Sequence, residues 1–276
     1  MQTILFPTDF SENAKRAYKY ALHVAAETGA SITTLHVYDA PVISSVMLPN
    51  TGQRILEQKE AAEKAAHSKS AEELHQIAVA EGLDNVSVTH LFEAGGPIDT
   101  ILTVAKELDS SVIIMGTKGA SGLDEIFVGS VTAQIIELAD RPVLAVPVNA
   151  VYSDVKNIVY ASNYAAVDEG TVSKTLELAE DFKAHVHCIH VNTDGVSEVK
   201  QLAVLREKFA EHKNHLTFNI VDNSSVISGI NSYVEDNKIN MILMYTKKHN
   251  FFEKLFLTSY TRKMAFHTEV PLLILK

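Results

Sequence analysis

Residues 111–119 have the sequence SVIIMGTKG, and Gly129-Ser130 follow after nine further residues. The run Ser111-Val-Ile-Ile-Met115 is short, apolar and rich in β-branched residues, which predicts a fully buried strand. Residues 131–139 place apolar side chains at helical spacing, with Ser130 expected as the N-cap. The order is therefore a strand, a glycine-containing loop and the N-terminus of a helix.

This order indicates a binding site for an anion. Glycine lets backbone N–H groups approach phosphate oxygens without an intervening Cβ. The unpaired N–H groups and the dipole of the following helix favour negative charge. Ser130 and Thr132 would add hydroxyl donors, and Lys118 would add a mobile positive charge.

The spacing of this stretch resembles that of a known family, the universal stress proteins. Residues 116–130 fit the motif G-x2-G-x9-G-[S/T] of the nucleotide-binding branch of the family. Neither the Walker P-loop motif nor the Rossmann motif G-x-G-x-x-G occurs in the chain. The alternative is that the three glycines only form turns and that Ser130 is an ordinary cap.

Composition limits the class of protein. The chain has 276 residues, 46% of them hydrophobic and 21% charged, which is typical of a globular protein. The net charge of −10 argues against a nucleic-acid surface, and no apolar run is long enough for a membrane helix. We see no secretion signal, and Cys188 is the single cysteine, so we expect a cytoplasmic protein without disulfides.

The chain alternates predicted strands with predicted helices, which indicates βαβ units and a mostly parallel sheet. In the first half we expect strands at 3–7, 31–37, 85–92, 111–115 and 141–147. The expected helices are 12–27, 53–81, 98–107 and 131–139, and residues 39–52 are expected to form a loop.

The pattern then starts again, so the chain contains two copies of one α/β unit. Residues 156–163 match 2–9, 184–191 match 30–37, 240–244 match 111–115, and 269–275 match 140–146. We place the domains at 1–149 and 150–276. The resemblance implies two tandem open, doubly wound, five-stranded, mostly parallel sheets that are Rossmann-like (adenine nucleotide alpha hydrolase-like). It also implies that the two copies pair through their last strands, and it leaves open whether two chains form a homodimer.

The second copy lacks the glycines of the first. By this alignment Gly116 corresponds to Tyr245, Gly119 to Lys248 and Gly129 to Thr258, whereas Ser130 corresponds to Ser259. Asp9 corresponds to Asn163. Side chains at these positions would fill the space that phosphates need, so we expect a degenerate second copy.

The family resemblance assigns the residues of a pocket for an adenine nucleotide (ATP, ADP or AMP, with or without Mg²⁺). The expected residues are Pro7, Thr8, Asp9, Val37, Met115, Gly116, Lys118, Gly119, Gly129, Ser130, Val131 and Thr132. Asp9 would accept a hydrogen bond from the adenine amino group or the ribose. The alternatives are a helix-capping role for Asp9, a solvated loop lysine for Lys118, and core positions for Val37 and Met115.

Other features suggest less. His185, His187 and His190 lie on one predicted strand, but no nearby cysteine or carboxylate completes a set of metal ligands. Cys188 is expected to be a buried small hydrophobic residue. The loop at 39–52 is either a lid over the nucleotide or a passive surface loop.

Three functions remain open at this stage. The first is a stress-response ATP-binding module with one nucleotide site. The second is a slow ATP hydrolase, for which Asp124 and Glu125 are the local candidates to orient water. The third is a dimerisation or scaffold protein that binds no nucleotide.

Overall fold

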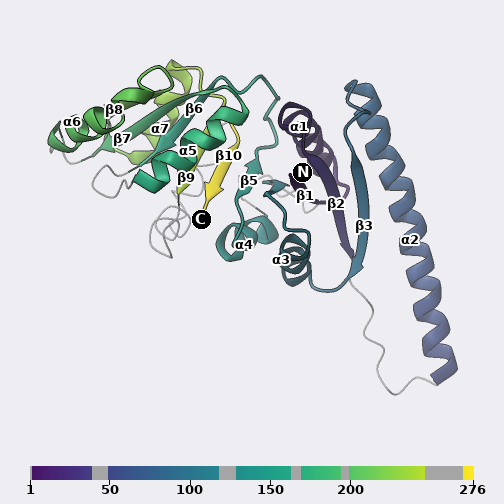
Figure 1. Ribbon diagram of the computed structural model, residues 1–276. Coiled ribbons are helices and arrows are strands. Elements are labelled where there is room, and N and C mark those ends of the chain that lie inside the picture. Colours follow the sequence, from purple (N-terminus) through teal and green to yellow (C-terminus); the bar gives the residue numbers. More distant parts are fainter. Residues whose placement is uncertain (1, 39–48, 118–128, 163–168, 194–198, 246–269) are drawn as a thin grey trace. The chain divides into compact units, whose positions relative to one another are not determined.

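In the computed structural model the chain is an α/β protein that divides into two compact units. The structure describes residues 2–38, 49–117, 129–162, 169–193, 199–245 and 270–276 (Figure 1). Unit 1 runs to Arg141 and unit 2 begins at Pro142 among these residues. The domain boundary at 149/150 stays a prediction from the sequence repeat.

The described residues of unit 1 form four parallel strands in the order β3-β2-β1-β4. Its elements are β1 (Thr3–Pro7), α1 (Glu12–Thr28), β2 (Ser31–Tyr38), α2 (Pro49–Ala80), β3 (Val88–Ala94), α3 (Pro97–Glu107), β4 (Val112–Gly116) and α4 (Ser130–Leu138). The chain reverses its direction of winding between β1 and β4, and α1 contacts α2 while α3 contacts α4. Such winding places the two helix pairs on opposite faces of the sheet, as doubly wound topology requires.

In unit 2 the part of the chain that the structure describes forms six strands in the order β5-β10-β9-β6-β7-β8. Its elements are β5 (Val143–Val146), β6 (Asn157–Ala161), α5 (Glu169–Asp181), β7 (His185–Asn192), α6 (Val199–Lys208), η2 (Ala210–His212), β8 (Leu216–Asp222), α7 (Val226–Asp236), β9 (Met241–Tyr245) and β10 (Leu272–Leu275). All neighbouring strands from β10 to β8 are parallel. Strand β5, which the sequence repeat assigns to the first copy, pairs antiparallel with β10.

Strand register confirms the internal repeat. Thr3 pairs with Ser31 in unit 1, and Asn157 pairs with His185 in unit 2, which is the pairing that the sequence alignment of the two copies demands. The backbone hydrogen bond made just after the first strand of each copy is repeated as well. The N–H of Thr8 donates to the Leu35 carbonyl and that of Ser162 to the Ile189 carbonyl, both at 2.9 Å.

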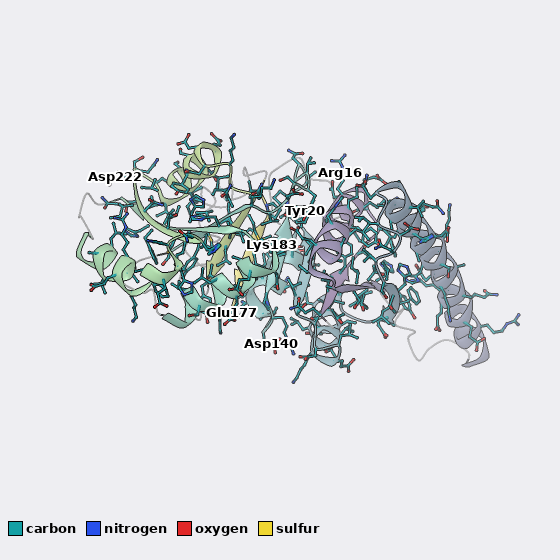
Figure 2. All side chains as sticks on the ribbon, turned by 45° about the horizontal axis from the view of Figure 1, so that its top comes forward. Arg16, Tyr20, Asp140, Glu177, Lys183 and Asp222 are labelled. Carbon is teal, nitrogen blue, oxygen red and sulfur yellow. The ribbon has the colours of Figure 1, made fainter. Side chains whose placement is uncertain are left out.

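The predicted buried strands form the core. Ile4, Leu5 and Phe6 of β1 are at most 1% exposed, as expected for a strand covered on both faces. Charged side chains lie outside: Figure 2 labels Arg16 on α1 and Glu177 on α5, and both are exposed. Gly29 ends α1 in the left-handed conformation with φ 68°, a backbone angle that glycine adopts without strain.

Most predicted boundaries in the first half lie within two residues of the observed ones, the starts of α2 and β3 differ by more, and the cap of α4 is displaced. Helix α2 begins at Pro49 rather than at residue 53, because proline is favoured in the first turn, where its missing N–H needs no partner. Strand β3 begins at Val88 rather than 85, because the N–H of Val86 closes a turn on the Leu83 carbonyl at 3.1 Å. Helix α4 has Gly129 as its N-cap, so the prediction that Ser130 caps it is wrong by one residue.

Candidate functional site

A cavity of about 360 Å³ lies in unit 1 at the carboxyl ends of β1 and β4. In open α/β sheets this is the point where ligands bind, because the chains leaving the two strands run to opposite faces. The volume is within the range of small-molecule pockets. The residues that line it include ten of the twelve predicted from the sequence: Pro7, Thr8, Asp9, Val37, Met115, Gly116, Gly129, Ser130, Val131 and Thr132.

The other predicted residues, Lys118 and Gly119, lie outside the described residues. The same holds for Asp124 and Glu125, the candidates for orienting a water molecule, and for residues 39–48, the greater part of the expected lid. The roles proposed for these residues stay predictions.

The chain turns sharply after β1, and a set of local hydrogen bonds fixes the turn. The Thr8 hydroxyl accepts from the N–H of Phe10 at 3.0 Å, and Phe10 has φ 57°, in the left-handed region. A non-glycine residue in this conformation is strained, and such strain clusters at functional sites. The turn carries Thr8 and Asp9 to the wall of the cavity at the point where α1 begins.

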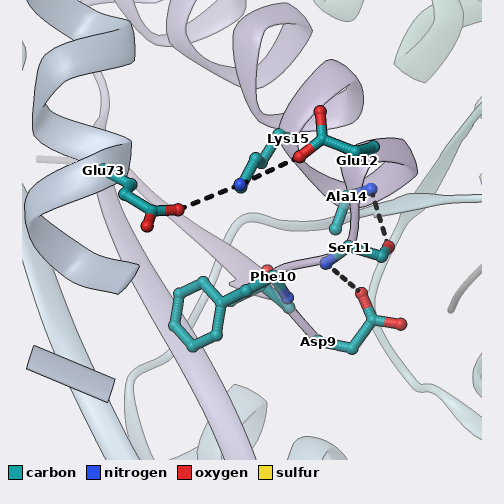
Figure 3. A network of polar contacts seen from close by, with 8 residues as sticks. Asp9, Phe10, Ser11, Glu12, Ala14, Lys15 and Glu73 are labelled. Carbon is teal, nitrogen blue, oxygen red and sulfur yellow. Dashed lines mark hydrogen bonds and ion pairs between the residues drawn. The ribbon is translucent and has the colours of Figure 1, made fainter. Parts of the chain in front are cut away.

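Asp9 has a structural role in this turn. Its Oδ1 accepts from the N–H of Ser11 at 3.0 Å, and the Ser11 hydroxyl in turn accepts from the N–H of Ala14 at 3.2 Å as the N-cap of α1 (Figure 3). Ser11, rather than Asp9, is therefore the cap, and Asp9 supports it. Figure 3 shows the second carboxylate oxygen of Asp9 turned away from Ser11. Local bonding thus holds the carboxylate in a fixed orientation beside the cavity.

The first turn of α1 is also tied to α2. Lys15 contacts Glu12 on its own helix and Glu73 on α2, with both Nζ–O distances 3.0 Å (Figure 3). The hydrogen bond from Lys15 lowers the pKa of the Glu73 carboxyl, and the bond to Glu73 is the main cause that raises the pKa of Lys15. These contacts hold the segment after Asp9 against the long helix.

The opposite wall of the cavity is the N-terminus of α4. The N–H of Gly129 donates to the Thr117 carbonyl at 2.7 Å, and the N–H of Ala133 donates to the Gly129 carbonyl at 3.0 Å. Between them, the N–H groups of residues 130–132 occupy the first turn, where an α-helix has no internal acceptors. A cavity bordered by these groups favours an anion.

The two hydroxyl residues of this turn differ. Thr132 is 5% exposed, and its hydroxyl donates to the Gly116 carbonyl at 3.0 Å, which ties α4 to the end of β4. Its single proton is therefore committed, and toward a ligand it offers acceptor lone pairs only. Ser130 is exposed and occupies the first helical position. Capping does not explain this serine, contrary to the sequence-based interpretation.

The backbone at Gly129 has φ −53° and ψ 144°, angles that any residue adopts. Backbone strain therefore gives no reason for glycine at this position. Gly129 lines the cavity, and a side chain at this position would add atoms beside it.

The sequence prediction missed five residues that line the cavity: Ala14, Leu35, His36, Pro97 and Ile101. Pro97 and Ile101 belong to α3. The glycine pair Gly95-Gly96 just before this helix is a sequence signal for the tight turn that leads into it. Gly95 has φ 152°, and a Cβ there would lie 2.8 Å from the Thr100 hydroxyl, so this turn requires glycine. His36 Nδ1 lies 2.8 Å from the Thr8 carbonyl oxygen. Because a carbonyl oxygen only accepts, Nδ1 carries the proton and donates this hydrogen bond.

The histidines of β7 have structural partners. His187 contacts the Tyr233 hydroxyl at 3.0 Å and Asn157 Oδ1 at 3.3 Å, and His190 contacts the Ser162 carbonyl at 3.2 Å. Burial is the main cause that lowers the pKa of His187, to about 4. Among the described residues no group of three or more histidine, cysteine or carboxylate side chains could hold a metal ion. Cys188 is fully buried, as predicted, and burial raises the pKa of its thiol.

Comparison with known proteins agrees with this fold. The model of the Usp (universal stress protein) family matches residues 1–147 and again 155–276. Universal stress protein MJ0577 of Methanocaldococcus jannaschii is 32% identical over 152 residues, which cover 52% of this chain and 93% of that protein. Universal stress protein Slr1230 of Synechocystis is 24% identical over 298 residues, covering 99% of both chains.

A solved structure with a similar fold aligns with nearly the full length of this chain. The crystal structure of a universal stress protein from Archaeoglobus fulgidus aligns with a TM-score of 0.75 at 21% identity, covering 99% of this chain and 98% of that one. Among the described residues, no helix has the length and apolar character needed to span a membrane.

Proposed function

The chain belongs to the universal stress protein family, with two tandem family domains, and we propose that its first copy binds an adenine nucleotide. In this proposal the chain is a stress-response module with one nucleotide site, in the cavity at the ends of β1 and β4. The nucleotide is ATP, or alternatively ADP or AMP, with or without Mg²⁺. The carrying observation is that all ten predicted site residues within the described part of the chain line this one cavity.

The geometry supports a role for each end of the cavity. The helix N-terminus at residues 130–132 would take the phosphates, because its N–H groups lack internal acceptors. Asp9, held by Ser11, would accept from the amino group of the base or from the ribose. Lys118 and Gly119 would complete the phosphate side.

The second copy supports the assignment of a single site. Tyr245 ends β9 at the position that Gly116 has at the end of β4, as the register of β9 on β6 and of β4 on β1 shows. We propose that this tyrosine, with Lys248 and Thr258, removes a nucleotide site of this kind from the second copy. We also propose that the two copies pair within one chain through their last strands, which the antiparallel register of β5 and β10 supports.

The test is the nucleotide content of the purified protein, measured by acid release and chromatography. We expect close to one adenine nucleotide per chain, or uptake of one when millimolar ATP and Mg²⁺ are added. The variant Gly119→Lys with Gly129→Thr should lose it. Threonine suits an N-cap and the backbone angles of residue 129, so this change fills the cavity without removing the helix start.

The matched control is Thr258→Gly, the reverse exchange at the corresponding position of the second copy, which should leave the nucleotide content unchanged. Full retention of nucleotide by the Gly119→Lys, Gly129→Thr variant would contradict the site. Absence of nucleotide in the parent protein after addition of ATP and Mg²⁺ would contradict the function.

A further inference from the structure

A second and larger cavity, of about 570 Å³, lies in unit 1 between α1, α2 and β3. Figure 1 shows the long helix α2 running beside β3, the edge strand of this unit. The cavity shares none of its lining residues with the candidate nucleotide site. Its volume is within the range of small-molecule pockets.

Two residues that line this cavity have polar atoms without a partner in the described part of the chain. The Tyr18 hydroxyl and His67 Nε2 are buried and make no hydrogen bond with any described residue. Tyr18 is 0% and His67 9% exposed, so bulk water does not compensate either group. Buried polar groups in native proteins nearly always have a partner, and a missing one suggests a molecule that the site takes up.

The unpartnered nitrogen of His67 is an acceptor. The imidazole ring of His67 makes a hydrogen bond with the backbone of Leu91 that raises the pKa of the ring, as a bond donated by the ring does. Since Nε2 has no partner among the described residues, Nδ1 is the nitrogen that donates it. In a neutral imidazole Nε2 then carries a lone pair. Burial is the main cause that lowers the pKa of His67, and His36 and His90 lower it further, which keeps the ring neutral near pH 7.

The formal charges around the cavity have one sign. Glu72 and Asp84 line it and both are exposed, and the lining residues that the structure describes include no lysine or arginine. Glu72 Oε1 accepts from Gln76 at 2.8 Å, an interaction that fixes the carboxylate without neutralising it. Two carboxylates on the described lining favour a positively charged occupant.

These observations favour one class of ligand. An acceptor nitrogen, a phenolic oxygen and two carboxylates all match a molecule rich in N–H donors. A metal ion fits less well, because no group of three or more ligating side chains in the described part of the chain is arranged to hold one. An anion would be repelled by Glu72 and Asp84.

We propose that the cavity between α1, α2 and β3 binds a small organic cation that carries protonated amino groups. The carboxylates of Glu72 and Asp84 attract the cation at the cavity surface. The Tyr18 hydroxyl and His67 Nε2 are buried behind that surface and become its hydrogen-bond partners as the lining side chains adjust to the occupant. This site is separate from the proposed nucleotide site and does not depend on it.

The probe is 1,4-diaminobutane, with the uncharged 1,4-butanediol as its matched control, titrated calorimetrically into the full chain. We expect saturable binding of the diamine at one site and no binding of the diol. The variant Glu72→Gln with Asp84→Asn should bind the diamine at least tenfold more weakly. Both side chains are exposed, so these changes should leave the fold intact.

The chain is acidic overall, so the control for charge is Glu107→Gln with Glu177→Gln. This variant removes two exposed carboxylates elsewhere and should bind the diamine as the parent does. Equal weakening in both variants, equal binding of the diol, or no diamine binding by the parent would each overturn the proposal. Nucleotide content measured on the same samples should not change, which separates this test from that of the proposed function.

Discussion

Two tyrosines of this protein should respond in opposite ways to the same substitution. Tyr18 of α1 is fully buried, and its hydroxyl has no partner among the residues that the structure describes. Tyr233 of α7 is half-buried, and its hydroxyl accepts from Asn219 Nδ2 and contacts His187 Nδ1, both at 3.0 Å. We therefore predict that Tyr18→Phe stabilises the folded chain and that Tyr233→Phe destabilises it.

The magnitudes follow from the cost of an unpaired polar group. A buried hydroxyl without a hydrogen bond costs about 1–3 kcal/mol, and removing it returns part of that cost. Phenylalanine keeps the ring contact with Phe6, whose centroid lies 5.4 Å away, so little packing is lost. At Tyr233 two hydrogen bonds disappear, each contributing about 0.5–1.5 kcal/mol, and His187 loses a partner.

The assay is urea unfolding at pH 7 in buffer without amines, with the free energy taken from the transition of the unit that carries each substitution. We expect the unfolding free energy to rise by about 1 kcal/mol for Tyr18→Phe and to fall by about 1–3 kcal/mol for Tyr233→Phe. A decrease for Tyr18→Phe equal to that for Tyr233→Phe would refute the reasoning. It would mean that the Tyr18 hydroxyl has a hydrogen-bond partner in solution.

Two further predictions concern stability. Leu74 is fully buried on α2, and Leu74→Ala should lower the free energy of unfolding, measured with urea, by about 2–5 kcal/mol. Ala61 is exposed on the same helix, and Ala61→Ser should change this free energy little. The second concerns pH: His187 has its pKa lowered to about 4, against an ordinary 6.5, so between these values the unfolded chain binds a proton that the folded chain does not. The free energy of unfolding should therefore fall as the pH drops from about 6.5 to about 4, by roughly 1–2 kcal/mol after allowance for partial exposure, and His187→Gln should flatten this part of the curve.

The sequence predicts much of the fold because its signals are local. The buried strands of each copy are short β-branched runs, and the repeat fixes which of them correspond. Most of the lining of the candidate cavity follows as well. Asp9 lies two residues after β1 and Gly116 ends β4, and a doubly wound order places these strands side by side.

The features that could not be predicted from the sequence depend mostly on contacts between residues far apart in the chain. Tyr18 has the spacing of a core residue of α1, and only the packing of α2 shows that its hydroxyl lacks a partner. Pro97 and Ile101 reach the first cavity because α3 crosses near the end of β2. The cap of α4 was misplaced because serine and glycine both occur at N-caps, and their order here does not distinguish the two positions.

The two copies together separate what the fold requires from what a site requires. Strand β9 pairs with β6 in the register that β4 has with β1, although Tyr245 stands where the first copy has Gly116. The sheet therefore does not need glycine at the end of this strand. At Gly129 the backbone angles do not need it either. Neither the strand register nor the backbone angles account for these two glycines, and both line the cavity at the N-terminus of α4. The nucleotide that we propose for this cavity would give a reason for both, which the Gly129→Thr substitution tests.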